Sequence, residues 1–420
     1  MTRLRELLRD KNFSLLWVSQ IISNFGDRLN QMALIGLIYA RTPGSPIELA
    51  KLLSFAIIPV FIIGPFAGIY VDRWNRKYTM ITCDLLRGFL VLLIPAAITY
   101  LRSMVPVYLL VFIIFSVTRF FLPSKLSIIP DIVHKEKLLL ANSLTSTTMM
   151  IATMIGFGCG GIIVARLGAK GGFYVDSATY FISALMVSFV ALRIKERINI
   201  LPASQKLRLI IKKTVLGDIK EGLRYLKNNR DIKMVASTMF LMMAGVGSIY
   251  IIIIVFVQEL LHSSTVHLGF LAMLLGAGLF LGSLAYGRFG ASLSKKKVIN
   301  FGLGATGLLV VIFSAGLKAY PSFLAAAFLS IVLGIFASPI VVSSNTLLHE
   351  VMADEMRGRV FSLLEIIMHI GFLMFMVLTS LAAEYIRKDL ILVVIGLIFS
   401  MIGFLKLVTG VMERKAVRQD

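Results

Sequence analysis

Charged residues and cysteines are scarce in this sequence. Only 15% of the 420 residues are charged, whereas 58% are apolar. A water-soluble domain carries about 25% charged residues, so this composition excludes an ordinary soluble fold. The two cysteines, Cys83 and Cys159, fall in apolar stretches, which excludes both a disulfide framework and a Cys-x-x-Cys metal site.

Enzyme motifs are missing as well. The sequence has no Gly-x-Ser-x-Gly nucleophile turn, no Gly-x-x-x-x-Gly-Lys-Ser/Thr phosphate loop and no His-Glu-x-x-His zinc pair. We therefore predict that the chain is not an enzyme and uses no cofactor, and the missing phosphate loop argues against an ATP-driven pump. Convergent His and carboxylate ligands are too few for a metal site, so metal transport is the weakest interpretation.

Long apolar runs fill most of the chain instead. Crossing the hydrocarbon core of a bilayer takes about 20 apolar residues in a helix. Twelve such runs predict an all-α membrane protein with twelve transmembrane helices in two pseudo-symmetric six-helix bundles. The expected spans are residues 13–40, 49–71, 79–101, 105–128, 141–165, 173–192, 232–257, 267–287, 298–317, 321–347, 360–384 and 390–411.

The basic residues are distributed unevenly among the loops. Most of the 43 Lys and Arg fall in the termini and in every second loop, and segments enriched in this way lie in the cytoplasm. We therefore predict a bacterial inner-membrane protein with cytoplasmic N- and C-termini, in which the charged residues 1–11 act as an uncleaved start to the first span. The same rule accounts for the net charge of +21, so nucleic acid is not an expected partner.

Three parts are expected along the chain. Residues 1–192 form an N-terminal six-helix bundle, residues 193–231 a cytoplasmic linker and residues 232–420 a C-terminal six-helix bundle. The linker is strongly basic, and its apolar residues between positions 216 and 226 recur at helical spacing. It is predicted to lie as an amphipathic helix on anionic lipid. Binding of a calmodulin-like partner is the alternative.

The two halves share sequence features. The segment that begins at Gly68 after the second span has a counterpart at Gly282 after the eighth span. A second pair is formed by the segments 131–143 and 350–362, and both pairs have nearly the same displacement along the chain. This indicates an internal duplication. Parallel repeats of six spans are typical of transporters that bind substrate between two rocking halves.

Residues 68–77 form the most specific motif of the chain. They read Gly-Ile-Tyr-Val-Asp-Arg-Trp-Asn-Arg-Lys and resemble the G-x-x-x-D-R-x-x-R-K signature of the major facilitator superfamily, at the same place between spans two and three. The resemblance covers essentially the whole chain and implies transport by alternating access. The expected gate residues are Gly68, Asp72, Arg73, Arg76 and Lys77.

The residue types of this gate indicate how each residue would act. Gly68 permits close helix approach, and the three basic residues anchor the loop at the inner surface. Asp72 is expected to accept hydrogen bonds from the N-terminus of span eleven near Gly358, where the helix dipole favours an anion. A plain positive-inside loop would explain the basic residues but neither Gly68 nor Asp72.

Two further stretches narrow the resemblance to a branch of the superfamily. Residues 24–27 (Asn-Phe-Gly-Asp) and the segment from Pro123 to Ser143 resemble macrolide efflux proteins and the enterobactin exporter. Residues 123–125 (Pro-Ser-Lys) are also similar to the lysophospholipid transporter. The resemblance therefore implies export, with lipid transport as an alternative.

Span five departs from the antiporter pattern G-x-x-x-G-P-x-x-G-G. Its residues are Ala152, Gly156, Phe157, Gly160 and Gly161, with Phe157 at the proline position. The small residues still predict tight packing of two helices. Without the proline, the kink that is linked to export in that pattern is not expected.

Polar residues inside the first span form a stripe. Gln20, Asn24, Asp27 and Gln31 recur on one face of a helix with about 100° per residue, and we expect that face to line a central cavity. Hydrogen bonding between helices of the N-terminal half is the alternative. Arg28 lies beside the stripe and is the expected counter-ion of Asp27.

Ionisable residues also occur in later spans, where each is a functional candidate because its burial is costly. Asp84 is expected to pair with Arg87 or with Arg119, either as a structural contact or as a coupling switch. Lys125 is a further cationic candidate. In span eleven, Glu365 and His369 are four residues apart and face the same way, so they could carry a coupling proton.

These features together predict a secondary active exporter of a hydrophobic or amphiphilic small molecule, driven by proton exchange. Protons, the substrate and membrane lipids are the expected partners of a monomeric protein. The residues expected to couple protons to substrate are Asp27, Asp84, Glu365 and His369. A lysophospholipid transporter or flippase is the alternative function, and a metal exporter is less favoured.

Overall fold

The computed structural model describes residues 2–71, 74–101, 103–191, 224, 227–262, 265–290, 292–351 and 357–416. The described residues form helices and connecting turns, with no strand among them. Nine helices in these ranges are long and apolar enough to cross a membrane.

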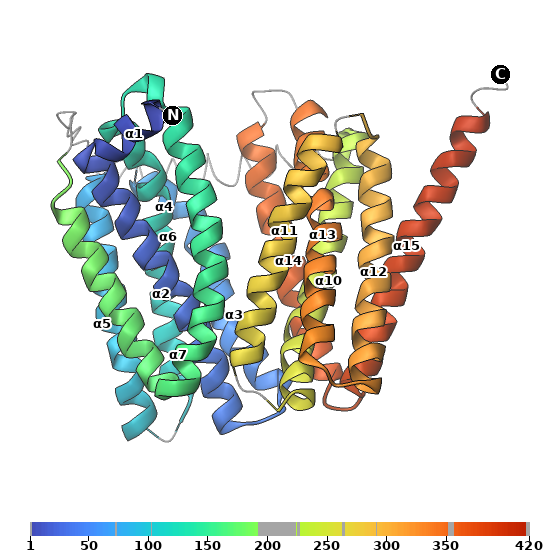
Figure 1. The fold of residues 1–420 in the computed structure, drawn as a ribbon, viewed down its shortest axis with the longest axis horizontal. Coiled ribbons are helices and arrows are strands. Elements are labelled where there is room, and N and C mark those ends of the chain that lie inside the picture. Colours follow the sequence, from blue (N-terminus) through green and yellow to red (C-terminus); the bar gives the residue numbers. More distant parts are fainter. Residues whose placement is uncertain are drawn as a thin grey trace. The chain divides into compact units, whose positions relative to one another are not determined.

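Within each half of the chain the helices follow one another with short connections (Figure 1). Those of the first half are α1 (Thr2–Arg9), α2 (Lys11–Arg41), α3 (Pro46–Ile62), α4 (Gly64–Val71), α5 (Arg76–Tyr100), α6 (Val105–Ile132), the 3-10 turn η1 (Lys135–Lys137) and α7 (Leu138–Ser188). Those of the second half are α10 (Arg230–Leu260), α11 (Val266–Phe289), α12 (Lys295–Ala319), α13 (Phe323–Val351), α14 (Arg357–Ala382) and α15 (Lys388–Ala416).

Each of the twelve predicted spans falls on these helices. The second span comprises α3 and α4, and α7 contains both span five and span six. The two parts of α7 meet at Gly168, whose φ of 71° lies in the left-handed region that glycine adopts without strain. Polar caps define other helix starts, because the Asn75 side chain accepts from the Tyr78 amide and the Asp10 carboxylate accepts from the Asn12 amide.

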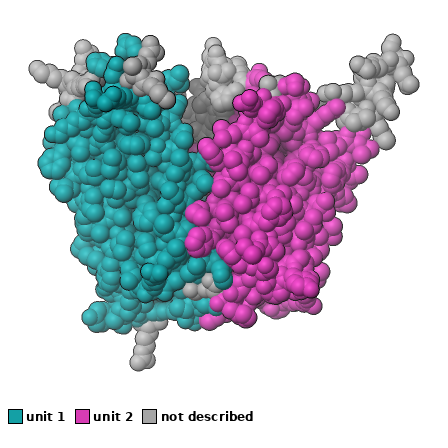
Figure 2. Space-filling view, viewed as in Figure 1, with its two compact units in different colours: residues 1–41, 51–213, 264–269 teal, residues 42–50, 214–263, 270–420 magenta. Residues whose placement is uncertain are grey.

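The chain divides into two compact units (Figure 2). Unit 1 holds residues 1–41, 51–213 and 264–269, and unit 2 holds residues 42–50, 214–263 and 270–420. The predicted linker, residues 193–231, lies largely outside the described residues. Its amphipathic helix, its lipid contact and the three-part division built on it therefore stay predictions.

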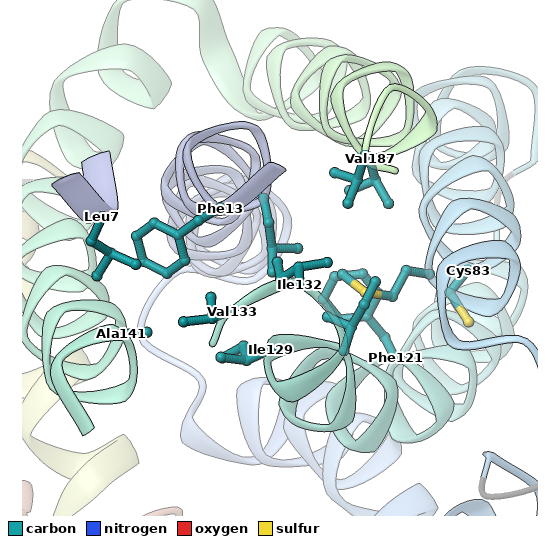
Figure 3. Packing of buried hydrophobic residues seen from close by; sticks show 13 residues of the cluster. Leu7, Phe13, Cys83, Phe121, Ile129, Ile132, Val133, Ala141 and Val187 are labelled. Carbon is teal, nitrogen blue, oxygen red and sulfur yellow. The ribbon is translucent and has the colours of Figure 1, made fainter. Parts of the chain in front are cut away.

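An apolar cluster fills unit 1 at the end where α2 and α5 begin and α6 ends (Figure 3). Leu7 of α1 and Phe13 of α2 are each 1% exposed and join Phe121, Ile129 and Ile132 of α6 in this cluster. An ion pair of 3.0 Å between Glu6 and Lys137 fastens α1 to the turn after α6. Van der Waals packing of these large side chains holds the helices together just beyond the polar site described below.

Small residues let α7 approach its neighbours closely, as expected for span five. A Cβ atom at Gly160 would lie 3.2 Å from the Leu29 Cα, and one at Gly156 would lie 2.9 Å from the Arg28 Cβ. Such distances are shorter than ordinary van der Waals contacts, so the predicted tight packing is confirmed for α2 and α7. The helix runs through Phe157 with helical backbone angles, which confirms the expected absence of a kink there.

Unit 2 has its own core between α10, α12, α13 and α14. Backbones of α12 and α15 come close at Gly307 and Gly396, where a Cβ on either residue would meet main-chain atoms of the other helix. Ion pairs flank these helices, with Asp389 contacting Lys318 and Lys388 lying 2.8 Å from Glu259. Each unit is therefore a helical bundle with its own apolar interior.

Candidate functional site

A buried ion pair on α5 is the centre of the polar site in unit 1. Asp84 is 0% exposed and Arg87 is 1% exposed, and Arg87 Nη2 donates to Asp84 Oδ1. The Ser183 hydroxyl of α7 donates to the other carboxylate oxygen of Asp84 at 2.8 Å. The predicted burial of Asp84 with an arginine is confirmed, and Arg87 rather than Arg119 is its partner.

Two aromatic rings complete the surroundings of Arg87. Its guanidinium carbon lies 4.1 Å from the centre of the Phe121 ring and 4.4 Å from that of Tyr180. A cation over an aromatic face gains up to about 2 kcal/mol when it is desolvated. The apolar cluster at the end of unit 1 thus continues directly into the site, because Phe121 belongs to both.

Asp27 of α2 faces the same arginine. Its Oδ1 accepts a hydrogen bond of 2.5 Å from the Tyr180 hydroxyl and lies 4.0 Å from Arg87 Nη1. The Asp27 side chain is 30% exposed, whereas Asp84 is fully buried. Asp27 is therefore the accessible carboxylate of this site.

The expected pairing of Asp27 with Arg28 is wrong. Arg28 Nη1 donates to Gln31 Oε1 at 3.1 Å, and its guanidinium lies 5.4 Å from the Phe157 ring centre. The reason is geometric, because consecutive residues of a helix point about 100° apart. Asp27 turns toward α5 and α7, and Arg28 turns toward the first part of α7.

The remaining members of the predicted stripe are held within their own helix. The Asn24 amide donates to the Gln20 carbonyl oxygen at 2.6 Å, and the Gln20 amide lies 3.4 Å from the Ser19 hydroxyl. Both side chains are buried in unit 1. The Asp27 contacts fit the alternative of bonding between helices, whereas the expected cavity lining stays a prediction.

Asp176 is a third carboxyl group that the sequence reasoning missed. It lies in the second part of α7, is 0% exposed, and accepts a 2.5 Å hydrogen bond from the Asn30 amide of α2 through Oδ2. The Thr179 hydroxyl lies 3.4 Å from its Oδ1. The contacts Asp27 to Tyr180 and Asn30 to Asp176 thus form two successive rungs between α2 and α7.

The missed residues carried a signal in the sequence. Asp176, Tyr180 and Ser183 recur at helical spacing inside an otherwise apolar span, so they share one face. An aspartate inside a span is already a functional candidate. The polar periodicity of span six therefore indicates this face, just as the polar periodicity of span one indicates its stripe.

Lys125 of α6 is buried as well, with 4% exposure. Its Nζ lies 3.0 Å from the Met149 sulfur of α7, and its charge interacts with those of Asp27, Arg87 and Asp84. The site therefore combines two cationic side chains with three carboxyl groups. The carboxyl groups of the site therefore outnumber its cationic side chains by one.

The expected gate is described only in part. Arg76 Nη1 donates to Asp131 Oδ2 at 2.6 Å and to the Ser127 carbonyl oxygen at 3.0 Å, which ties the start of α5 to the end of α6. Gly68 lies in α4 and Lys77 in α5. Asp72 and Arg73 lie outside the described residues, so the contact expected between Asp72 and span eleven stays a prediction.

Glu365 and His369 lie on α14 in unit 2. The His369 Nδ1 is 2.8 Å from the main-chain oxygen of Glu365, a contact that does not involve the Glu365 side chain. The Glu365 side chain is exposed. Their role in coupling stays a prediction.

The described ranges contain no set of side chains that is placed to bind a metal ion. Those ranges hold no group of three or more His, Cys, Asp or Glu residues placed to bind one ion. The three carboxyls of unit 1 bond instead to Tyr, Asn, Thr, Ser and Arg groups.

The close approach of α2 and α7 at the site yields a prediction for Gly26. A Cβ there would lie 2.5 Å from Asp176 Oδ1 and 3.0 Å from the Thr179 Cβ. Gly26→Ala should push the two helices apart and destabilise the protein by about 1–3 kcal/mol, measured as a lower thermal unfolding midpoint in detergent. Gly316→Ala, at a position with nothing within 4 Å of a new Cβ, is the matched control. Equal midpoints for the two variants would contradict this packing.

The fold and the charged site inside a spanning bundle define a polytopic membrane transporter of the major facilitator superfamily. A family model described as "Transmembrane secretion effector" matches residues 6–414, and the chain belongs to this family. The predicted superfamily and the predicted all-α fold are thereby confirmed.

Relatives and solved structures agree with this assignment. The chain is 24% identical over 410 residues to the MFS-type transporter YfiS of Bacillus subtilis, covering 95% of this chain and 93% of the relative. It is 22% identical over 385 residues to Macrolide efflux protein A of Streptococcus pyogenes, covering 89% and 90%.

Two solved structures show a similar fold. One is a bacterial homologue of the iron transporter ferroportin in an inward-facing state, with a TM-score of 0.70, 14% identity and coverage of 96% of this chain and 99% of that one. The other is a bacterial homologue of the human lysosomal transporter Spinster, with a TM-score of 0.68, 16% identity and coverage of 96% and 98%.

Proposed function

We propose that this transporter exports hydrophobic or amphiphilic small molecules in exchange for protons, with Asp27 as the carboxylate that meets both. The observation that carries this proposal is the position of Asp27. It is 30% exposed beside a fully buried Arg87–Asp84 pair, so it is the group that a proton or a substrate can reach. A charged group in a span costs about 2.5–3.5 kcal/mol, and such a group is retained where it has a function.

Support for export comes from the resemblance to Macrolide efflux protein A. We further propose that the protein is a monomer of the bacterial inner membrane with both termini in the cytoplasm. This orientation follows from the basic residues of its termini and alternate loops. An exporter then takes substrate from the cytoplasmic side and carries protons inward.

Inverted membrane vesicles test this function. Their lumen corresponds to the outside of the cell, so an acidic lumen should drive a macrolide such as erythromycin inward, and a protonophore should abolish the accumulation. Vesicles without the transporter provide the background. Accumulation that is indifferent to the pH gradient would contradict proton coupling. Movement of a fluorescent lysophospholipid in place of the macrolide would favour the lipid-transport alternative.

A further inference from the structure

Asp176 is buried, and its direct hydrogen-bond partners are neutral side chains. Its Oδ2 accepts from the Asn30 amide at 2.5 Å, and its Oδ1 lies 3.4 Å from the Thr179 hydroxyl. The neighbouring Arg87 is engaged by Asp84 and Asp27. Across the described residues, no lysine or arginine forms an ion pair with Asp176.

An ionised carboxyl in these surroundings would be expensive. Burying an unpaired charge costs far more than burying a neutral polar group, and two hydrogen bonds return only part of that cost. The protonated acid fits the same contacts. The acid still accepts a hydrogen bond from the Asn30 amide. Its own O–H can point at the Thr179 hydroxyl oxygen, since that hydroxyl donates its hydrogen to the main-chain carbonyl oxygen of Asp176 at 2.7 Å.

Charged neighbours on other helices couple Asp176 to the rest of the site. The groups that act on it are the Asp27 carboxylate of α2 and the Arg87 guanidinium of α5, and Tyr180 lies one turn away on its own helix. Asp27 and Asp84 already balance Arg87 and Lys125 in charge. A third carboxylate would leave the site one negative charge in excess, and like charges at close range resist simultaneous ionisation.

We propose that Asp176 is a second proton-binding carboxyl of the transport cycle, protonated while Asp27 is ionised and able to release its proton when Asp27 is neutralised. The step breaks only the carboxyl O–H bond, and the proton passes to water. The charge that forms on Asp176 replaces the charge lost at Asp27, so the net charge of the site is unchanged. This inference deepens the proposed function, and the role of Asp176 in the transport cycle rests on that function. The protonation of Asp176 does not depend on transport.

Infrared difference spectroscopy on the purified full chain in lipid membranes measures that protonation directly. An ordinary aspartate is ionised at neutral pH. Here the wild-type spectrum at neutral pH should contain a protonated-carboxyl band that Asp176→Asn lacks. Glu384→Gln, which alters an exposed carboxyl between α14 and α15, should keep the band. Loss of ionised-carboxylate bands in Asp176→Asn instead would overturn the proposal.

Two further variants test the contacts and the coupling. Asn30→Ala removes the donor to Oδ2, so the band should shift in frequency, and an unshifted band would contradict the contact. This variant also serves if Asp176→Asn does not fold. In Asp27→Asn the competing negative charge is gone, so the Asp176 band should disappear at a lower pH than in the wild type. An unchanged pH dependence would show that the two carboxyls do not influence each other.

Transport measurements distinguish a failure of this inference from a failure of the proposed function. In inverted vesicles, Asp176→Asn should lower pH-driven erythromycin accumulation at least tenfold but preserve downhill entry without a gradient. Full pH-driven accumulation in this variant would overturn the role of Asp176 in the cycle. A wild-type protein that ignores the pH gradient would instead refute the proposed function, and the infrared result would still decide whether Asp176 holds a proton.

Discussion

Replacing Arg87 with glutamine should destabilise the protein by about 3–5 kcal/mol, the cost of leaving a buried charge without its partner. Asp84 is 0% exposed and has Arg87 as its cation, with Ser183 as the remaining donor. The substitution also removes the guanidinium contacts to the Phe121 and Tyr180 rings. The measurement is the thermal unfolding midpoint of the purified protein in detergent.

Three companion variants separate charge pairing from packing. Arg87→Lys keeps the charge but loses the planar fork that serves two carboxylates and two rings, so it should fall between the wild type and Arg87→Gln. Adding Asp84→Asn to Arg87→Gln removes the carboxylate that has lost its cation, so part of the lost stability should be recovered. Arg166→Gln, at an exposed arginine of α7, should change stability by less than about 0.5 kcal/mol. If Arg87→Gln behaved like Arg166→Gln, the buried pair would not support the bundle.

Asp27→Asn should have the largest effect on transport and a small effect on stability. The asparagine side-chain oxygen can still accept from Tyr180, and the position is 30% exposed, so the fold should hold. The variant can no longer bind and release a proton. Accumulation of erythromycin driven by the pH gradient should therefore fall at least tenfold, which corresponds to about 1.4 kcal/mol of lost coupling.

Matched variants show whether that loss is specific. Glu384→Gln removes an exposed carboxyl outside the site and should retain wild-type accumulation. Glu365→Gln tests the other proton carrier considered from the sequence. Wild-type accumulation in Asp27→Asn combined with its loss in Glu365→Gln would move the coupling role from α2 to α14.

The helices could be predicted from the sequence because each one depends only on its own run of apolar residues. Runs of about 20 apolar residues can only be helices in a bilayer, and all twelve expected spans fall on described helices. The close packing of α2 against α7 was equally readable, since Gly156 and Gly160 have no side chain to hold the helices apart. The pairing of Asp84 with Arg87 could be expected because the two residues lie one turn apart on α5.

Contacts between helices were harder to foresee. Sequence proximity suggested that Arg28 would neutralise Asp27, whereas the rotation of α2 directs Asp27 to Arg87 and directs Arg28 to Gln31. Which face of a helix meets which neighbour depends on packing across the whole bundle. Neutral partners are harder still to predict than charge pairs, and the partners of Asp176 are the neutral side chains of Asn30 and Thr179.

If the site in unit 1 exchanges protons for substrate as proposed, adding substrate must move protons. The most direct measurement is the lumenal pH of inverted proteoliposomes, followed with a trapped pH-sensitive dye while erythromycin is added to the outside. With an acidic lumen, erythromycin should accelerate alkalinisation of the lumen in wild-type vesicles but not in Asp27→Asn vesicles. An equal response in both, or erythromycin entry without any proton movement, would contradict the proposed exchange.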